Sequence, residues 1–102
     1  MKINEILAEM DSVIVSGRIT YIGIRRTVKT RYGEASVATA VLEDETGKIA
    51  LNLWRDQIDL VKDGDLVQIE NGFVKTYQDK LELNVGSRGK IVLISRNKSI
   101  TT

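Results

Sequence analysis

The sequence of 102 residues contains no cysteine and no histidine. Without cysteine, the chain has no disulfide, no thiolate nucleophile and no cysteine-based zinc site. Without histidine, it also lacks the commonest general base and the commonest ligand of transition metals. Catalysis would have to rest on carboxylate, lysine, tyrosine or hydroxyl groups, so we expect neither an enzyme nor a bound metal or cofactor.

The acidic and glycine-rich segments do not supply an active site either. The runs EDE at 43–45 and DGD at 63–65 are typical of turns, and neither has the alternating ligands and distal glutamate of a calcium loop. The segment GSRGK at 86–90 lacks the spacing, the hydroxyl residue after lysine and the following helix of a phosphate-binding loop. We interpret all three segments as turns.

Long apolar runs are also missing. The first residues, MKINEILAEMD, carry acidic groups where a signal peptide has its apolar stretch, and no segment has the length of a membrane span. With 42% hydrophobic residues, the chain suffices for one core. We expect a cytoplasmic, nucleoid-associated protein without membrane attachment, monomeric, with one domain over residues 1–94 and a polar, disordered tail over 95–102.

Alternating apolar and β-branched residues predict an all-β protein. A short helix or turn is expected at 3–10, and another at 55–65 between the third and fourth strands. We interpret 25–35 as a polar loop, and 89–94 as an extension or cap of the sheet. The five predicted strands are 12–24, 36–43, 48–54, 65–77 and 80–86. They predict a small closed barrel, because closure removes exposed edges, although periodicity alone leaves an open sandwich as the alternative.

The third predicted strand, KIALNLW, turns the only tryptophan of the chain away from the core. Ile49, Leu51 and Leu53 share one face of this strand, so Trp54 falls on the opposite one. An aromatic residue in a small β-protein is more often part of the core. For Trp54 we favour a functional role, because its strand already presents three aliphatic side chains to the core.

The dipeptide NG at 71–72 predicts a bulge in the fourth strand, and one extra residue there reverses the register. Phe73, Lys75 and Tyr77 then point outward beside Trp54, while Val74 and Thr76 point inward. Without the bulge, Phe73 belongs to the core, and pattern alone leaves both interpretations open for Phe73 and Tyr77.

The two remaining tyrosines give weaker signals. Tyr21 follows the phase of Ile19 and is expected in the core. Tyr32 lies in the basic loop, where both a core and a surface role stay open.

The charges are segregated along the chain although the net charge is only +1. The segment RRTVKTR at 25–31 carries four cations and no acid. Such a cluster is usually a solvated loop, but in a five-stranded barrel the loops after strands one and four flank the outer face of strands two and three. The cations expected to line that face are Arg25, Arg26, Lys29, Arg31, Lys75, Lys80, Arg88 and Lys90.

An aromatic face flanked by cations fits a single-stranded nucleic acid. Unpaired bases expose flat π faces, and stacking one on an aromatic side chain is worth ~1–3 kcal/mol for any base. Lysine and arginine add phosphate contacts that weaken as salt rises. A duplex hides its base faces, so this surface should reject it.

The segments DETGKIALNLW, VKDGDLVQIENGFVKTY, LELNVGS and MDSVIVSGRI together resemble the archaeal single-domain OB-fold single-stranded DNA-binding proteins, which are related to replication protein A. The resemblance covers roughly residues 10–92. It implies an OB barrel that stacks bases on Trp54, Phe73 and Tyr77, with Arg26 in the first loop. Phe73 stands where the family often has tryptophan and Tyr77 where phenylalanine is familiar. The resemblance also implies an acidic or glycine-rich tail that recruits partners; the given sequence stops at NKSITT, which leaves open whether such a tail is lost or trimmed.

We therefore predict a sequence-tolerant binder of single-stranded DNA that protects exposed strands during replication, recombination or repair. Arg26 and Lys75 are the foremost phosphate ligands. Two alternatives stay open: an RNA-binding OB domain, since stacking does not depend on the 2′-hydroxyl, and an interaction subunit whose aromatic face is buried against another protein.

Overall fold

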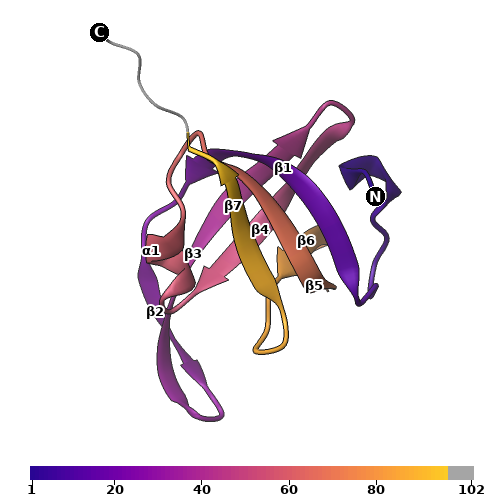
Figure 1. Cartoon of the computed structure of the whole chain (residues 1–102). Helices are drawn as coiled ribbons and strands as arrows, with labels where there is room; N and C mark the ends of the chain where they lie inside the picture. Colours follow the sequence, from indigo (N-terminus) through magenta and orange to yellow (C-terminus); the bar gives the residue numbers. More distant parts are fainter. Residues whose placement is uncertain (97–102) are drawn as a thin grey trace, which may run out of the picture.

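The computed structural model describes residues 1–96, whose strands wrap into a barrel (Figure 1). The elements are η1 (Ile3–Glu5), β1 (Val13–Ile22), β2 (Arg26–Thr30), β3 (Gly33–Asp44), β4 (Gly47–Trp54), α1 (Gln57–Leu60), β5 (Leu66–Tyr77), β6 (Lys80–Asn84) and β7 (Lys90–Ser95). The predicted disordered tail falls mainly on residues 97–102, which lie outside the described residues. In the described part of the chain, no helix is long and apolar enough to span a bilayer.

The strand order β1-β3-β4-β6-β5 forms a closed ring, because β1 pairs with β3 along its second half and with β5 along its first half. The neighbours in this ring are antiparallel except β4 and β6, which are parallel. Strand β7 adds to β5 on the outside of the ring. The predicted five-stranded OB barrel is confirmed, as are the extension of the sheet by 89–94 and the short helix α1 between the third and fourth strands of the ring.

The segment predicted as a polar loop, 25–35, is instead largely strand. Strand β2 pairs antiparallel with the start of β3, from Arg26 opposite Val37 to Thr30 opposite Gly33. Gly33 has φ of 110°, which allows the tight return of the chain. This hairpin extends away from the barrel (Figure 1), so much of it lacks a core and carries polar residues on both faces, which hides the alternation that predicts a strand.

The bend of β1 depends on close backbone approach and on a bulge. A Cβ atom at Gly17 would lie 2.8 Å from the carbonyl oxygen of Glu43, so only glycine fits there. Ile19 pairs with Leu42 and Tyr21 with Val41, which leaves residue 20 as one extra residue on β1. The bulge turns Tyr21 outward with 57% exposure, so its predicted place in the core is wrong.

The core fills the barrel with aliphatic side chains. The predicted inward residues Leu51, Leu53 and Ile69 have no exposed surface. Full burial of each such side chain stabilises the fold by ~1.5–3 kcal/mol. The N-terminal segment covers one end of the barrel with Ile3 and Ile6, and its predicted short helix or turn is the 3₁₀ turn η1.

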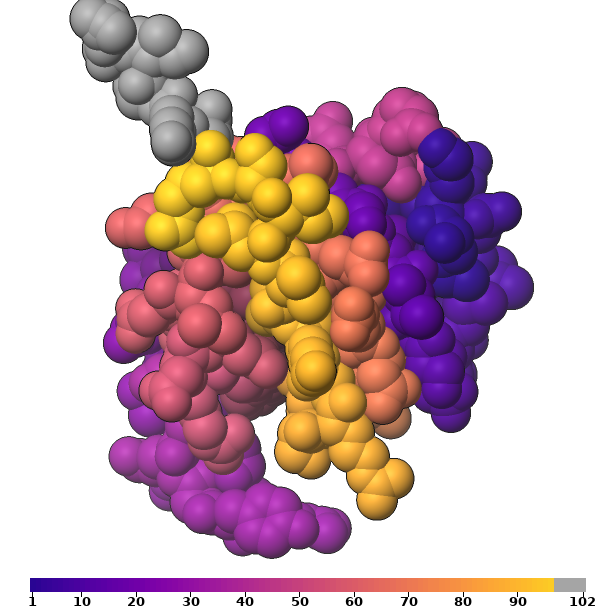
Figure 2. Space-filling model, in the orientation of Figure 1, coloured from indigo at the N-terminus to yellow at the C-terminus, as the bar shows by residue number. Residues whose placement is uncertain are grey.

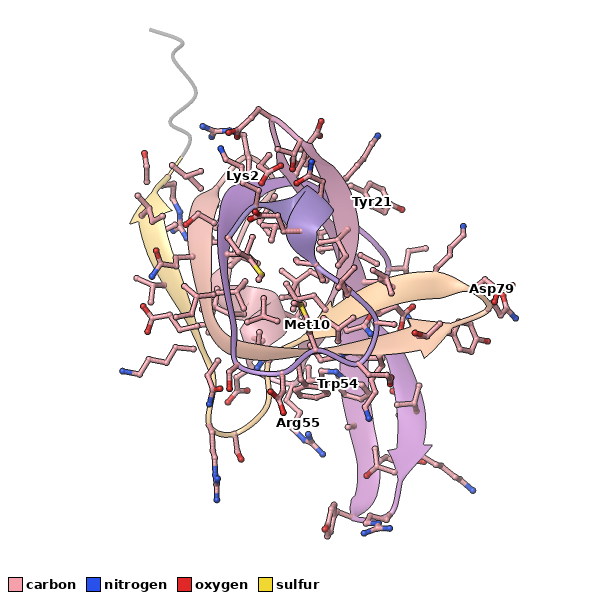
Figure 3. All side chains as sticks on the ribbon, turned by 90° about the vertical axis from the view of Figure 1, so that its right-hand side faces the viewer. Lys2, Met10, Tyr21, Trp54, Arg55 and Asp79 are labelled. Atoms are coloured by element: carbon pink, nitrogen blue, oxygen red, sulfur yellow. The ribbon has the colours of Figure 1, made fainter. Side chains whose placement is uncertain are left out.

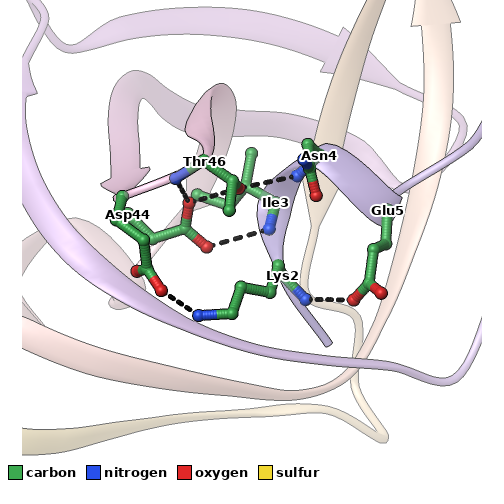
Figure 4. Close-up of polar contacts among 7 residues, drawn as sticks. Lys2, Ile3, Asn4, Glu5, Asp44 and Thr46 are labelled. Carbon is green, nitrogen blue, oxygen red and sulfur yellow. Dashed lines mark hydrogen bonds and ion pairs between the residues drawn. The ribbon is translucent and has the colours of Figure 1, made fainter.

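Hydrogen bonds fix the N-terminal turn to the β3–β4 connection (Figure 4). The Asp44 carboxylate accepts from the backbone N–H of Ile3 at 2.9 Å and from the Thr46 hydroxyl at 2.6 Å. The Thr46 hydroxyl in turn accepts from the N–H of Asn4, and Lys2 forms an ion pair with Glu45. Burial acts to raise the pKa of Asp44, but the hydrogen bonds outweigh it and lower the pKa to about 2.

A buried carboxylate ties the end of β7 to the turn before β5. Asp65, with 1% exposure, accepts from the N–H of Lys62 at 2.9 Å and from the Arg96 guanidinium at 3.2 and 3.3 Å. Burial opposes ionisation of this carboxyl, but Arg96 and the Lys62 N–H hold its pKa below the ordinary value. The Asp65–Arg96 pair therefore holds the C-terminal end of β7 against the turn before β5.

Candidate nucleic-acid interface

One side of the barrel carries outward side chains from β5, β6, β4 and β3 in register. Residues paired in a ladder share a face of the sheet. Phe73 pairs with Asn84, Asn84 with Asn52, and Asn52 with Thr39, so these four residues form a row across four strands. We call this side the aromatic face. Its residues are Thr39, Asn52, Trp54, Phe73, Lys75, Tyr77, Glu82 and Asn84.

Trp54 lies on the aromatic face and is half-buried. Its indole N–H donates to the Oδ1 atom of Asn84 at 3.0 Å, across from β4 to β6. Its backbone N–H donates to Gln57, whose own amide donates to the carbonyl of Val85. Trp54 points outward, as predicted; Asn84 holds its indole, and Gln57 holds its backbone.

A hydrogen-bonded network of side chains forms the floor beside Trp54. Asn52 donates to Glu82 at 3.0 Å and to Asn84 at 3.3 Å, and accepts from the Thr39 hydroxyl at 2.8 Å. Asn52 and Asn84 are 7% and 6% exposed although they point outward, so their polar atoms need these partners. Sequence reasoning missed both asparagines. The available signal was their alternation with buried leucines in LNLW and LELN.

The bulge predicted at 71–72 is present and sets the position of Phe73. Val15 pairs with Ile69 and Val13 with Gly72, so β5 has one extra residue in this interval, and Asn71 has φ of 54°. Beyond it, Val74 is buried and Phe73 lies on the outward row. A Cβ atom at Gly86 would come within 3.2 Å of the Phe73 ring, so the glycine lets the ring lie against the β6–β7 loop.

Lys75 and Tyr77 follow Phe73 on the outward side of β5, toward the hairpin tip. Tyr77 is 61% exposed and pairs with Lys80, while Lys75 pairs with Glu82. Gln78 and Asp79 have φ of 51° and 65°, as a two-residue hairpin turn with two left-handed positions requires. Thr76, predicted to point inward, is exposed, because this hairpin extends past the barrel (Figure 3).

The four cations of the segment 25–31 are distributed over the β2–β3 hairpin rather than gathered. Arg26 pairs with Val37, and Val37 pairs with Trp54, so Arg26 shares the outward side with Trp54 at two strand spacings, about 9.5 Å. Lys29 pairs with Glu34 on the opposite face of the hairpin. Arg26 is therefore the cation of β2 that the ladders place on the same side of the sheet as Trp54.

The other two cations of this segment have protein partners. Arg25 forms an exposed ion pair with Asp59 of α1 at 2.9 Å. Arg31 lies at the hairpin turn, with its guanidinium 6.0 Å from the centre of the Tyr32 ring. Tyr32, whose role the sequence left open, is 84% exposed.

Arg88 and Arg55 add positive charge at the end of the aromatic face near Trp54. Arg88 lines a hollow of about 370 Å³ together with Phe73, between the start of β1 and the β6–β7 loop. Figure 2 shows the surface hollowed between the β2–β3 hairpin and this loop. Arg55 was not predicted. It is exposed, follows Trp54 directly and has φ of 54°, and its adjacency to the tryptophan was the signal.

The described residues contain no cluster of three or more acidic side chains that could hold a metal ion. The aromatic face carries the half-buried rings of Trp54 and Phe73 and the exposed ring of Tyr77. Cations lie within one to two strand spacings of these rings. Rings of this kind stack with planar π systems, and the cations attract anions between them.

Comparisons with known proteins show which family and which relatives the chain is similar to. The family model described as single-stranded DNA binding protein Ssb-like, OB fold, matches residues 6–93. A single-stranded DNA binding protein Ssb from Saccharolobus solfataricus is 31% identical over 96 residues, which cover 94% of this chain and 65% of that protein. A replication factor A from Methanothermobacter thermautotrophicus is 36% identical over 96 residues, covering 90% of this chain and 12% of that protein.

The fold has a close counterpart among solved structures. An OB domain from Thermoplasma acidophilum superposes with a TM-score of 0.82 at 26% identity, covering all of this chain and 92% of that domain. The chain spans 65% of the length of the Saccharolobus protein and 12% of the length of the Methanothermobacter protein.

Proposed function

Because the chain belongs to the Ssb-like family of OB-fold single-stranded DNA-binding proteins, we propose that it binds single-stranded DNA by stacking bases on the aromatic face. The observation that carries this proposal is the position of Trp54. Its ring faces outward from the barrel, is fixed by Asn84 before any ligand arrives, and lies between Phe73 on one side and Arg26 on the other.

Trp54, Phe73 and Tyr77 supply the stacking surfaces in this proposal. A ring that is already held in one orientation does not lose side-chain freedom when a base stacks on it, and this cost is otherwise about 0.5–1.5 kcal/mol per side chain. Each stack is worth ~1–3 kcal/mol for any of the bases, so binding is tolerant of sequence. Tyr77, which is more exposed, contributes the adaptable end of the surface.

The cations hold the phosphates between the stacked bases. Arg26 and Lys75 lie on the outward side of the strands that flank the rings, and Lys80 and Arg88 stand at the two loops that border β5 and β6. Lys29, opposite Glu34, and Arg25, paired with Asp59, contribute through the general field of the hairpin rather than by direct contact. Arg31, at the turn of the β2–β3 hairpin, contacts the DNA only where the DNA passes this turn.

A protein with this mode of binding protects exposed single strands during replication, recombination or repair. The stacking surface needs bases that are unpaired, so the protein should distinguish a single strand from a duplex without reading a sequence.

A titration with oligo-dT, followed by tryptophan emission, tests the proposal directly. Trp54 is the only tryptophan, so every change in emission reports on the aromatic face. We expect strong quenching, with a plot of log affinity against log salt of slope roughly −2 to −3 for three to four phosphate contacts. A duplex of the same length is the matched control and should compete poorly. Unchanged emission at saturating oligo-dT would contradict the proposal, and oligo-U as a competitor measures how far binding extends to RNA.

A further inference from the structure

A second hollow lies at the β1 edge of the aromatic face. It has a volume of about 420 Å³. The residues around it include Tyr21, Gly23, Thr39, Val41, Lys48 and Ala50. None of these residues belongs to the stacking set proposed above. The walls are mainly apolar side chains, and one cation stands at the rim.

The hollow is continuous with the face that carries Trp54. Ala50, Asn52 and Trp54 are alternate residues of β4, so they point to the same side. Trp54 lies four residue steps along β4 from Ala50, a distance of about 13 Å at 3.3 Å per residue. Across the strands, Ala50 pairs with Val41 and Val41 with Tyr21, which places the tyrosine at the β1 edge of the same surface.

The bulge in β1 is what brings Tyr21 to this surface. If β1 were regular here, with residue 20 paired, Tyr21 would share the inward phase of Ile19, and the ring would belong to the core. A Cβ atom at Gly23 would lie 3.6 Å from the Tyr21 ring and 3.0 Å from the carbonyl oxygen of Thr39. The glycine therefore leaves the space beside the ring open. Figure 3 shows Tyr21 projecting from the same side of the barrel as the hairpin tip at Asp79.

We propose that this hollow is a further base-binding subsite, in which Tyr21 stacks on a nucleobase of the strand that Trp54 already holds. The inference rests on the proposed binding of single-stranded DNA. An exposed tyrosine beside small apolar side chains suits a flat, largely apolar base, and Lys48 supplies a cation for the phosphate next to it. Because the hollow and Trp54 lie on the same side of β4, the expected occupant is a base of the DNA molecule that also stacks on Trp54.

The charges near the subsite are consistent with this occupant. In the β3–β4 ladder Lys48 lies opposite Glu43, and in the β4–β6 ladder Ala50 lies opposite Glu82. Glu82 accepts from the Asn52 amide, so its carboxylate is partly engaged with the floor of the aromatic face. Glu82 lies on β6, on the side of β4 away from β3 and β1, so DNA that crosses β3 from Trp54 to Tyr21 keeps its phosphates away from this carboxylate.

The test compares the binding of short and long oligo-dT to wild-type protein and to Tyr21→Ala, with lengths of about 4 and about 12 nucleotides, both within the range of OB-fold site sizes. The short strand should occupy the Trp54 end and bind both proteins equally. The long strand should bind Tyr21→Ala roughly 5- to 150-fold more weakly than wild type, as expected for one lost stack. Methyl NMR signals of Val41 and Ala50 should shift with the long strand and stay in place with the short one.

Two variants serve as controls. Tyr21→Phe keeps the ring and should bind the long strand like wild type. Ile14→Ala truncates another exposed residue of β1, in the half of the strand that pairs with β5, and should not change binding. Thermal unfolding of each variant establishes that it is folded.

The outcomes separate the two proposals. If wild type binds neither length, the proposed function fails and the subsite fails with it. If wild type binds both lengths, but Tyr21→Ala matches it throughout and the two methyl signals do not move, only the subsite is overturned. An equal loss at both lengths would also overturn it, because Tyr21 would then support the whole face instead of contacting one added base.

Discussion

Replacing Trp54 by alanine removes the ring on which the proposed interface depends, with limited damage to the fold. The indole is half-buried, and its N–H donates to Asn84. The Oδ1 atom of Asn84 also accepts from Asn52, so it keeps a partner after the substitution. We therefore expect the free energy of unfolding to fall by only about 1–2 kcal/mol, from one hydrogen bond and part of a ring surface.

The loss in binding should be larger than this structural effect explains. One lost stack corresponds to ~1–3 kcal/mol, or roughly a 5- to 150-fold increase in Kd for oligo-dT. Because the variant has no tryptophan, the assay is fluorescence anisotropy of a labelled oligonucleotide, with urea unfolding followed by circular dichroism in parallel. Trp54→Phe is the matched control, since it keeps a ring but loses the donor to Asn84. A folded Trp54→Ala protein with wild-type affinity would refute the reasoning.

Three further predictions use the same preparations. Asn84→Ala should release the indole of Trp54 and weaken oligo-dT binding by the ordering cost of one side chain, about 0.5–1.5 kcal/mol, measured by anisotropy; unchanged affinity would show that the indole needs no support. Arg26→Ala should reduce the steepness of the salt dependence by about 0.7, whereas Lys29→Ala should leave it nearly unchanged, and the reverse order would contradict the placement of the two cations. The pKa of Asp44 lies at about 2, below its value of about 3.9 in the unfolded chain, so its ionised form adds stability above about pH 4 that is lost between about pH 4 and 2. Thermal unfolding from about pH 6 to about pH 2 should therefore show a smaller loss of Tm for Asp44→Asn than for wild type, and equal losses would rule out this contribution.

Much of the barrel was predictable because its inner side chains alternate with outer ones. Leu51 and Leu53 on one face of β4 predict that Trp54 lies on the other, and the structure has this arrangement. The Asn-Gly dipeptide at 71–72 likewise predicts the bulge that sends Phe73 outward. In both cases a short-range pattern decides the direction of the side chain.

Tyr21 shows where such patterns fail. The bulge at residue 20 has no glycine or asparagine in its own place to mark it, and its effect is to reverse the phase from Ile19 onward. Simple alternation therefore assigned the ring to the core. The irregularity lies in the part of β1 that pairs with β3, just beyond the part that pairs with β5, and these pairings depend on strands far away in the sequence.

The β2–β3 hairpin and the asparagine network were missed for a different reason. The hairpin has polar residues on both faces and gains its strand pairing outside the core, so no hydrophobic period marks it. Asn52 and Asn84 meet only because β4 and β6 run parallel as neighbours, although 32 positions separate them in sequence. The outward position of each asparagine was visible from alternation, while their hydrogen bond to one another was not.

The central claim, that bases of a single strand stack on the aromatic face, is tested most directly by intermolecular NOEs in the complex with oligo-dT. We predict contacts from thymine protons to the rings of Trp54 and Phe73. Contacts confined to the opposite side of the barrel, around the exposed side chains of β7, would contradict the account.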